Sequence, residues 1–312
     1  MSADRLAEVS DLFVVAAVLL YLFSMVGFAL ELAFGRARSD AAATPAAVGA
    51  GAPVEAADGA PSAPQEGVEP PSWAPKAGVA GLVLGWLGWA ANLGAIVTRG
   101  LAVDRWPWGN MYEFVVAICF AAVTAFLVTQ TRQNVRFLGP FVMIAATLGL
   151  GFAVKVLYTA AGPVVPALNS YWVAIHVTAA ILASGLFILA GVAGILYLVR
   201  GDGLSRLPSR ADLERVAHRA IVLSFPVWTF AVIAGALWAD KAWGRYWGWD
   251  PKEVWAFITW VAYAAYLHAR VTAGWRGRAA TIVQLIAFGC LLFNLIGVNI
   301  FISGLHSYAD VN

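Results

Sequence analysis

The stretch VAIHVTAAILASGLFILAGVAGILYLV, residues 173–199, contains no acidic residue, lysine or arginine. A helix needs about 20 apolar residues to cross the hydrocarbon core of a bilayer, so this stretch is long enough to span it. Across the chain 61% of residues are hydrophobic and 12% are charged, whereas a soluble domain carries about 25% charged residues. The sequence therefore predicts an integral membrane protein.

Apolar runs of this kind recur along the whole chain. They lie at about 11–34, 77–98, 112–130, 137–158, 173–199, 219–239, 254–270 and 280–303. They predict an all-α fold, a polytopic transmembrane helix bundle of about eight spans. The first run is too long for a signal peptide and lacks an A-x-A cleavage site directly after it, so we expect a retained helix. Cys119 and Cys290 each lie inside a run and are expected to be small buried side chains.

Residues 36–76 differ from the rest because they are rich in Ala, Pro and Gly and carry scattered acidic residues. This composition buries too little apolar surface to fold alone. We expect a disordered cytoplasmic tether at 36–76. It would join an N-terminal transmembrane helix at 1–35, loosely, to a seven-span domain at 77–312.

The orientation follows from the arginines of the short loops, because cytoplasmic loops carry an excess of Lys and Arg. Three loops that share one side contain ten of them: Arg132, Arg136, Arg200, Arg206, Arg210, Arg215, Arg219, Arg270, Arg276 and Arg278. Both termini and the segments near 99–111, 159–172 and 240–253 are then expected on the extracytoplasmic face of the plasma membrane. The net charge of +2 is no evidence for a nucleic-acid partner, because the basic residues sit in short clusters between apolar runs, and we expect no such partner.

The external segment Lys241-Ala-Trp-Gly-Arg-Tyr-Trp-Gly-Trp-Asp-Pro-Lys-Glu-Val-Trp255 is crowded with tryptophan. An interfacial aromatic belt accounts for one or two of its indoles. A belt does not explain four of them packed around glycines and Asp250 in one loop. We favour a platform on which a flat aromatic ligand stacks, because stacked rings are stabilised beyond their area of contact. The four are Trp243, Trp247, Trp249 and Trp255.

Two of the four histidines fall on the same face as this loop. His176 lies in the first turns of the fifth span, and His306 lies just past the eighth. They are either two unrelated interfacial side chains or a pair of axial ligands for a haem iron, and we favour the ligands. His268 lies about 22 Å deeper than Glu253, near the cytoplasmic end of its helix, so it serves a second site or snorkels to the surface. His218 is expected to be an ordinary surface residue.

A further external segment, Arg105-Trp-Pro-Trp-Gly-Asn-Met-Tyr-Glu113, precedes the third span. Asn110 and Glu113 stand at a helix start, where a polar cap and an acidic first turn stabilise the helix without any ligand. We therefore favour a structural role for both residues over direct ligation.

The run Trp243-Gly-x-x-Trp-Gly-Trp-Asp-Pro-Lys-Glu253 resembles the WWD motif of the haem-handling protein superfamily. More narrowly, the sequence resembles the CcsA/ResC membrane subunit of the system II cytochrome c synthase. The matching segments lie between residues 105 and 308, about two thirds of the chain. They are Pro107-Trp-Gly-Asn-Met-Tyr-Glu113, Tyr171-Trp-x-x-x-His176, the tryptophan loop, Tyr266-Leu-His268 and Gly304-Leu-His-Ser-Tyr308.

The resemblance implies a function in cytochrome c biogenesis. It implies that His176 and His306 hold the iron of haem b over the tryptophans, and that thiols of a Cys-x-x-Cys-His motif on apocytochrome c add to the haem vinyl groups. His268 matches a deeper haem site, which a CcsB/ResB-type partner subunit would complete. Five external cations are candidates to pair with the haem propionates: Arg99, Arg105, Lys241, Arg245 and Lys252.

Three other functions remain open. A haem exporter or chaperone would relay haem without attaching it. A b-type electron carrier would need paired histidines at similar depth, whereas His176 and His268 lie at opposite depths. A transporter of unrelated small molecules would leave the tryptophan loop unexplained.

Overall fold

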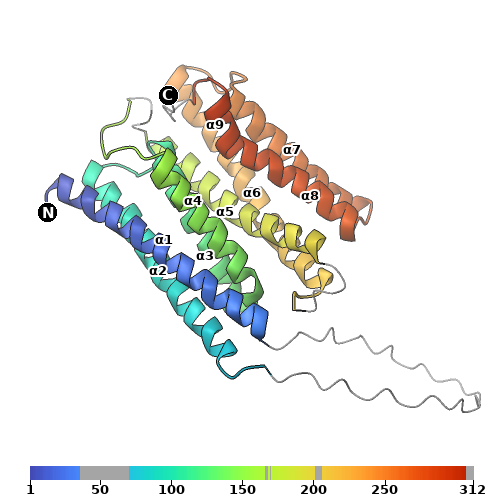
Figure 1. Ribbon diagram of the computed structural model, residues 1–312. Helices are drawn as coiled ribbons and strands as arrows, with labels where there is room; N and C mark the ends of the chain where they lie inside the picture. Colours follow the sequence, from blue (N-terminus) through green and yellow to red (C-terminus); the bar gives the residue numbers. More distant parts are fainter. Residues whose placement is uncertain (36–69, 166–167, 169, 201–205, 307–312) are drawn as a thin grey trace, which may run out of the picture.

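The computed structural model describes residues 1–35, 70–165, 168, 170–200 and 206–306. All regular structure in this part of the chain is helical (Figure 1). The long helices are α1 (Ala3–Phe34), α2 (Ala74–Val103), α3 (Met111–Arg132), α4 (Gly139–Val156), α5 (Tyr171–Val199), α6 (Arg210–Trp243), α7 (Pro251–Thr272) and α8 (Gly277–Leu292). A 3-10 turn η1 (Arg136–Leu138) precedes α4, and α8 continues through a π-helical segment η3 (Phe293–Gly297) into α9 (Val298–Phe301).

The predicted helical membrane bundle is confirmed. Among the described residues, 7 helices are long and apolar enough to cross a membrane. The remaining long helix, α7, has 22 residues, or about 33 Å, so its length also suffices. Its tryptophans and tyrosines, together with His268 and Arg270, make it less apolar than the others.

The middle of the bundle is formed by α3 and α5, whose membrane-length stretches are mostly buried. Small residues allow these backbones to approach closely. A Cβ on Gly185 of α5 would lie 2.6 Å from the backbone carbon of Ala121 in α3. On the other side of α5, Gly191 and Gly194 leave room for Phe288 and Gln284 of α8. In Figure 1, α1 and α2 flank one side of this centre, and α7 and α8 flank the other.

The first helix packs closely against the bundle, so the expectation of a loose attachment is wrong. Ser24 of α1 donates a hydrogen bond of 2.6 Å to the carbonyl of Gly81 in α2, and Ser10 donates one of 2.8 Å to Ala95. A Cβ on Gly27 would lie 2.7 Å from the carbonyl oxygen of Ala77. Residues 36–69 of the predicted tether lie outside the described residues.

Contacts between side chains define two ends of the bundle. At one end, Tyr112 and Tyr158 donate hydrogen bonds of 3.4 and 2.7 Å to Asp11 of α1. The segments after α2, α4 and α6 gather there, and we name it the tryptophan end. At the other, the arginine end, Arg136 pairs with Glu31 at 3.1 Å.

The helix α7 runs from one end to the other, because Asp250, which caps its start, contacts His306 at the tryptophan end. Arg270 near its last turn pairs with Glu214 at the arginine end. The segments that the sequence predicts to share one side therefore lie at the same end of the bundle.

The contact between α1 and α2 makes a direct prediction for paired glycine variants. Gly27→Ala forces the two backbones apart and should destabilise the protein by about 1–3 kcal/mol. Gly151→Ala is the matched control, because a Cβ there meets nothing within 4 Å. Unfolding of both variants in detergent measures the difference. Equal stability would contradict close packing of α1.

Candidate functional site

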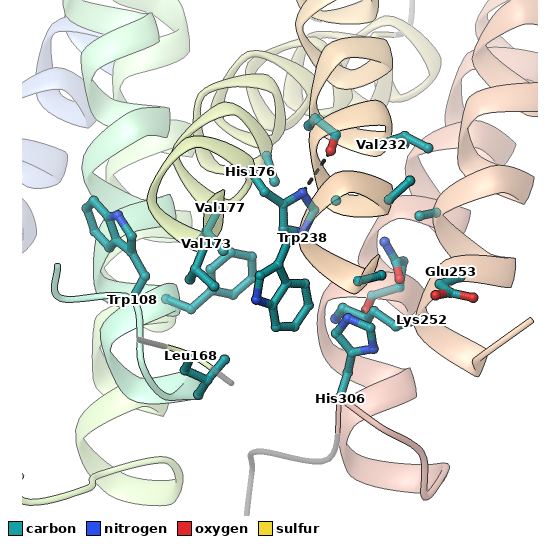
Figure 2. Close-up of a pocket in the computed structure, with 18 of the residues that line it drawn as sticks. Trp108, Leu168, Val173, His176, Val177, Val232, Trp238, Lys252, Glu253 and His306 are labelled. Carbon is teal, nitrogen blue, oxygen red and sulfur yellow. Dashed lines mark hydrogen bonds between the residues drawn. The ribbon is translucent and has the colours of Figure 1, made fainter. Parts of the chain in front are cut away.

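A cavity opens at the tryptophan end between α5, α6, α7 and the segment after α8 (Figure 2). Its volume is about 140 Å³, and its walls are almost entirely apolar. Its lining brings together both histidines of the predicted site with several indoles: His176, Trp228, Trp238, Trp243, Trp247 and His306. The sequence-based expectation that the two histidines approach one tryptophan-rich site agrees with this geometry.

His176 is placed by the start of α5. Ser170 caps the helix by accepting a hydrogen bond from the Trp172 N–H, so His176 falls on its second turn. The Nδ1–H of His176 donates a 2.8 Å hydrogen bond to the carbonyl of Ala231 in α6. A Cβ on Gly235 would lie 2.7 Å from the imidazole, so only glycine leaves room for this ring. With Nδ1 engaged, Nε2 is the nitrogen through which His176 can bind a metal.

His306 is held by Asp250. The Nδ1–H of His306 donates to Oδ2 of Asp250 at 2.7 Å, and the Leu305 N–H donates to Oδ1 at 2.7 Å. Burial alone raises the pKa of Asp250, but the hydrogen bonds from His306 and Leu305 outweigh it, and the net pKa lies below its ordinary value. Both oxygens of Asp250 accept hydrogen bonds from N–H groups, which is the pattern expected of a carboxylate.

Trp238 lies between the two imidazoles in Figure 2. Its ring is parallel to that of His176, with centroids 6.1 Å apart, and edge-on to that of His306 at 5.6 Å. Trp243 completes the group, 4.8 Å from Trp238 and 5.0 Å from His306. The motif-based prediction omitted Trp238. The sequence signal that could have identified it is its position near the end of the sixth span, about one and a half helical turns before Trp243.

The tryptophan loop owes its shape to the ends of two helices. Gly244 ends α6 in the left-handed region, with φ of 70°, and its N–H donates to the backbone carbonyl of Asp240. Asp250 caps α7, and the carboxylate of Glu253 accepts from the N–H groups of Gly248 and Asp250 at 2.9 and 3.0 Å. Pro251 supplies a favourable first helical residue. Several residues of the motif are therefore explained by their roles in ending α6 and starting α7, without any ligand.

Two of the four predicted tryptophans lie outside the cavity lining. Trp255 packs against Phe293, with centroids 4.3 Å apart. Trp249 is 69% exposed and contacts Trp247 edge-on. Its φ of 59° is in the left-handed region, which is strained for a bulky residue. The motif does not distinguish these two side chains from Trp243 and Trp247, because their directions depend on the loop conformation.

Asn110 and Glu113 have the structural role that the sequence favours. Asn110 caps α3 by accepting from the Glu113 N–H at 2.9 Å, although it also lines the cavity. The buried carboxylate of Glu113 accepts from Arg99 at 3.1 Å and from Arg105 at 2.8 Å. Arg105 also donates to the carbonyl of Gly162. This ion-pair cluster joins the segments after α2 and α4.

The wall near η3 contains a polar residue, Asn294, that sequence reasoning missed, beside Lys252, which it had considered. Asn294 is 2% exposed and lines the cavity, and its Oδ1 has no hydrogen-bond partner among the described residues. Lys252 donates from Nζ to the backbone carbonyl oxygen of Asn294, not to its side chain, at 2.5 Å. A π-helical turn inside an α-helix is frequent at functional sites.

The other two histidines are remote from the cavity lining. His268 is exposed on α7 and shares a 3.4 Å hydrogen bond with Thr272. His218 is only partly exposed, and its Nδ1 shares a 3.3 Å hydrogen bond with the hydroxyl of Tyr266. The expectation that His218 is an ordinary surface residue is therefore wrong, because it packs between α6 and α7.

The family model of the cytochrome C assembly proteins matches residues 108–306. A cytochrome c biogenesis protein CcsA of Chlamydomonas reinhardtii is 35% identical over an alignment of 228 residues, which covers 70% of this chain and 65% of that protein, just under two thirds. The CcsA of Gloeobacter violaceus is 29% identical over 69% of this chain and 82% of its own. That of Synechococcus elongatus is 32% identical over 75% and 87%. The chain belongs to the cytochrome C assembly family, as a CcsA-type integral membrane protein of cytochrome c biogenesis.

Proposed function

We propose that the cavity at the tryptophan end binds haem b, with His176 and His306 as axial ligands. The observation that carries this proposal is the convergence of two imidazoles on one apolar, indole-lined cavity. Each imidazole already has a hydrogen-bond acceptor at Nδ1, which directs Nε2 to a metal. A six-coordinate haem iron takes two axial ligands, and two imidazoles are one pair that can supply them.

The two imidazoles are suitable ligands for a haem iron, but the cavity is too small to hold haem unless side chains move. Ligand sites are commonly about 300–1,000 Å³, whereas this cavity measures about 140 Å³. Trp238 occupies the space between the imidazoles. We infer that its indole would have to move aside before haem could contact both imidazoles.

The proposed reaction is that of a holocytochrome c synthase, also called a cytochrome c haem lyase. Bound haem supplies two vinyl groups, to which the thiols of an apocytochrome Cys-x-x-Cys-His motif add. This chain needs no nucleophile of its own. Its residues hold the reacting edge in place, which lowers the entropic part of the barrier, and the apolar walls exclude water. A haem exporter or chaperone is the alternative, and an assay for haem that survives denaturing electrophoresis distinguishes attachment from relay.

Among the five cations considered for the propionates, Lys252 is best placed. Of these five cations, only Lys252 is among the described residues that line the cavity. Arg99 and Arg105 are committed to Glu113, and Lys241 pairs with Asp240 at 3.3 Å. Arg245 folds over Gly248.

We further propose that α7 faces a CcsB/ResB-type partner subunit in the plasma membrane. His268 is exposed on α7 together with Phe257, Val261 and Ala265, which recur at helical spacing on one face. An ionisable side chain facing lipid is costly, so a protein partner there is favourable. The partner would complete a deeper haem site, and the cavity at the tryptophan end would face the extracytoplasmic side.

Removal of either axial ligand should release haem. His176→Ala and His306→Ala should each lose most of the haem that the purified chain retains and abolish cytochrome c maturation. Added imidazole should restore part of both, because it fills the vacant axial position. His218→Ala, outside the cavity lining, is the control. Full haem content in both ligand variants would exclude these ligands.

The tryptophans should differ according to their position. Trp243→Ala should weaken haem binding about fivefold, because a stacked ring contributes on the order of 1 kcal/mol. Trp249→Ala, the matched control, should change affinity less, since its indole is outside the lining. Haem titration measures both. An equal loss in the two variants would show that the loop acts as a whole.

The deeper site makes a separate prediction. His268→Gln should lower haem occupancy of the outer cavity although both axial ligands are intact, because haem no longer arrives from the deeper site. Haem supplied from outside should restore this variant more than His176→Ala. Normal cytochrome c maturation in the His268→Gln variant would contradict the existence of the deeper haem site.

A further inference from the structure

We infer that Asp250 is a positioning residue that fixes the iron-binding nitrogen of His306 and makes this imidazole the stronger electron donor of the two axial ligands. The inference rests on the proposed haem site and goes beyond it, because it assigns to the aspartate of the tryptophan loop a role in tuning the iron rather than in contacting haem.

The geometry of the carboxylate carries this inference. Asp250 is 7% exposed, and its two oxygens accept from neighbouring groups of one segment, the Nδ1–H of His306 and the N–H of Leu305, each at 2.7 Å. A carboxylate that accepts from one ring nitrogen fixes the tautomer and raises the basicity of the other. His306 is thereby held with Nε2 as its metal-binding nitrogen.

The position of Asp250 is itself fixed by α7. Its side chain accepts from the Lys252 N–H at 3.2 Å, and its own N–H donates to Glu253 at 3.0 Å, which completes a capping box. A Cβ on Gly304 would lie 2.7 Å from Oδ1 of Asp250. Glycine therefore allows the chain before His306 to approach the carboxylate closely. The rigid start of α7 is thus coupled to a ligand in a loop.

The two proposed ligands are consequently inequivalent. Nδ1–H of His176 donates to the neutral backbone carbonyl of Ala231, whereas that of His306 donates to a carboxylate. A charged acceptor forms the stronger hydrogen bond and gives the imidazole more anionic character. A more anionic imidazole stabilises ferric over ferrous iron and lowers the reduction potential of the haem.

The test compares Asp250→Asn with Glu253→Gln in the full-length chain loaded with haem. Asparagine is as good a helix cap as aspartate, and glutamine can replace glutamate in a capping box. Each variant therefore removes one negative charge from the same loop and keeps α7 intact. Asp250→Asn should raise the haem midpoint potential more than Glu253→Gln, and it should weaken haem binding about 10- to 100-fold.

Equal potential shifts in the two variants would overturn the inference, because they would reflect the lost charge alone. An unchanged potential and affinity in Asp250→Asn would also overturn it, while leaving the haem site in place. A wild-type chain that binds no haem would overturn both. The potential is the decisive measurement, since a purely structural role for the cap does not alter it when the fold is retained.

Discussion

Water is absent from the interior of a bilayer, so a polar group buried in a membrane-spanning bundle must find its partner within the protein. Several polar side chains of this chain meet that requirement, although a few buried polar atoms, such as Oδ1 of Asn294, have no partner among the described residues. The hydroxyls of Ser10 and Ser24 in α1 donate to backbone carbonyls of α2. The charged clusters lie toward the helix ends, where Glu113 forms ion pairs with Arg99 and Arg105. The middle of the bundle consists largely of alanine, glycine and branched aliphatic residues, which pack closely.

The same constraint shapes the candidate site. The two imidazoles at the tryptophan end are partnered by a backbone carbonyl and by a carboxylate, and neither partner is a nearby residue in the sequence. Asp250 links the start of α7 to the segment after α9. The site therefore depends on the relative placement of α5, α6 and α7, and its geometry is set by helix ends rather than by the cavity walls.

Much of this organisation was predictable from the sequence. Long uncharged runs identify the spans, and the arginine bias predicts which loops share a side, so His176 and His306 were expected to meet the tryptophan loop. The predicted spans agree with the helices to within several residues at most ends. The helix α6 is the largest exception, since it begins at Arg210 and extends well beyond its apolar run. Charged residues are compatible with a helix that continues out of the membrane.

The directions of individual side chains were not predictable. Trp249 and Trp255 belong to the same motif as Trp243 and Trp247, yet only the latter pair lines the cavity. That difference arises from a left-handed residue in the loop and from packing on η3. Trp238 and Asn294 belong to no recognisable sequence motif. Their place in the site follows only from how α6 and the segment after α8 converge.

Electron paramagnetic resonance of ferric haem bound to the full-length chain tests the central claim most directly. Two imidazole ligands from His176 and His306 predict a single low-spin ferric signal characteristic of bis-histidine coordination. A high-spin signal, or a low-spin signal of a thiolate or of one histidine with a different second ligand, would contradict the account.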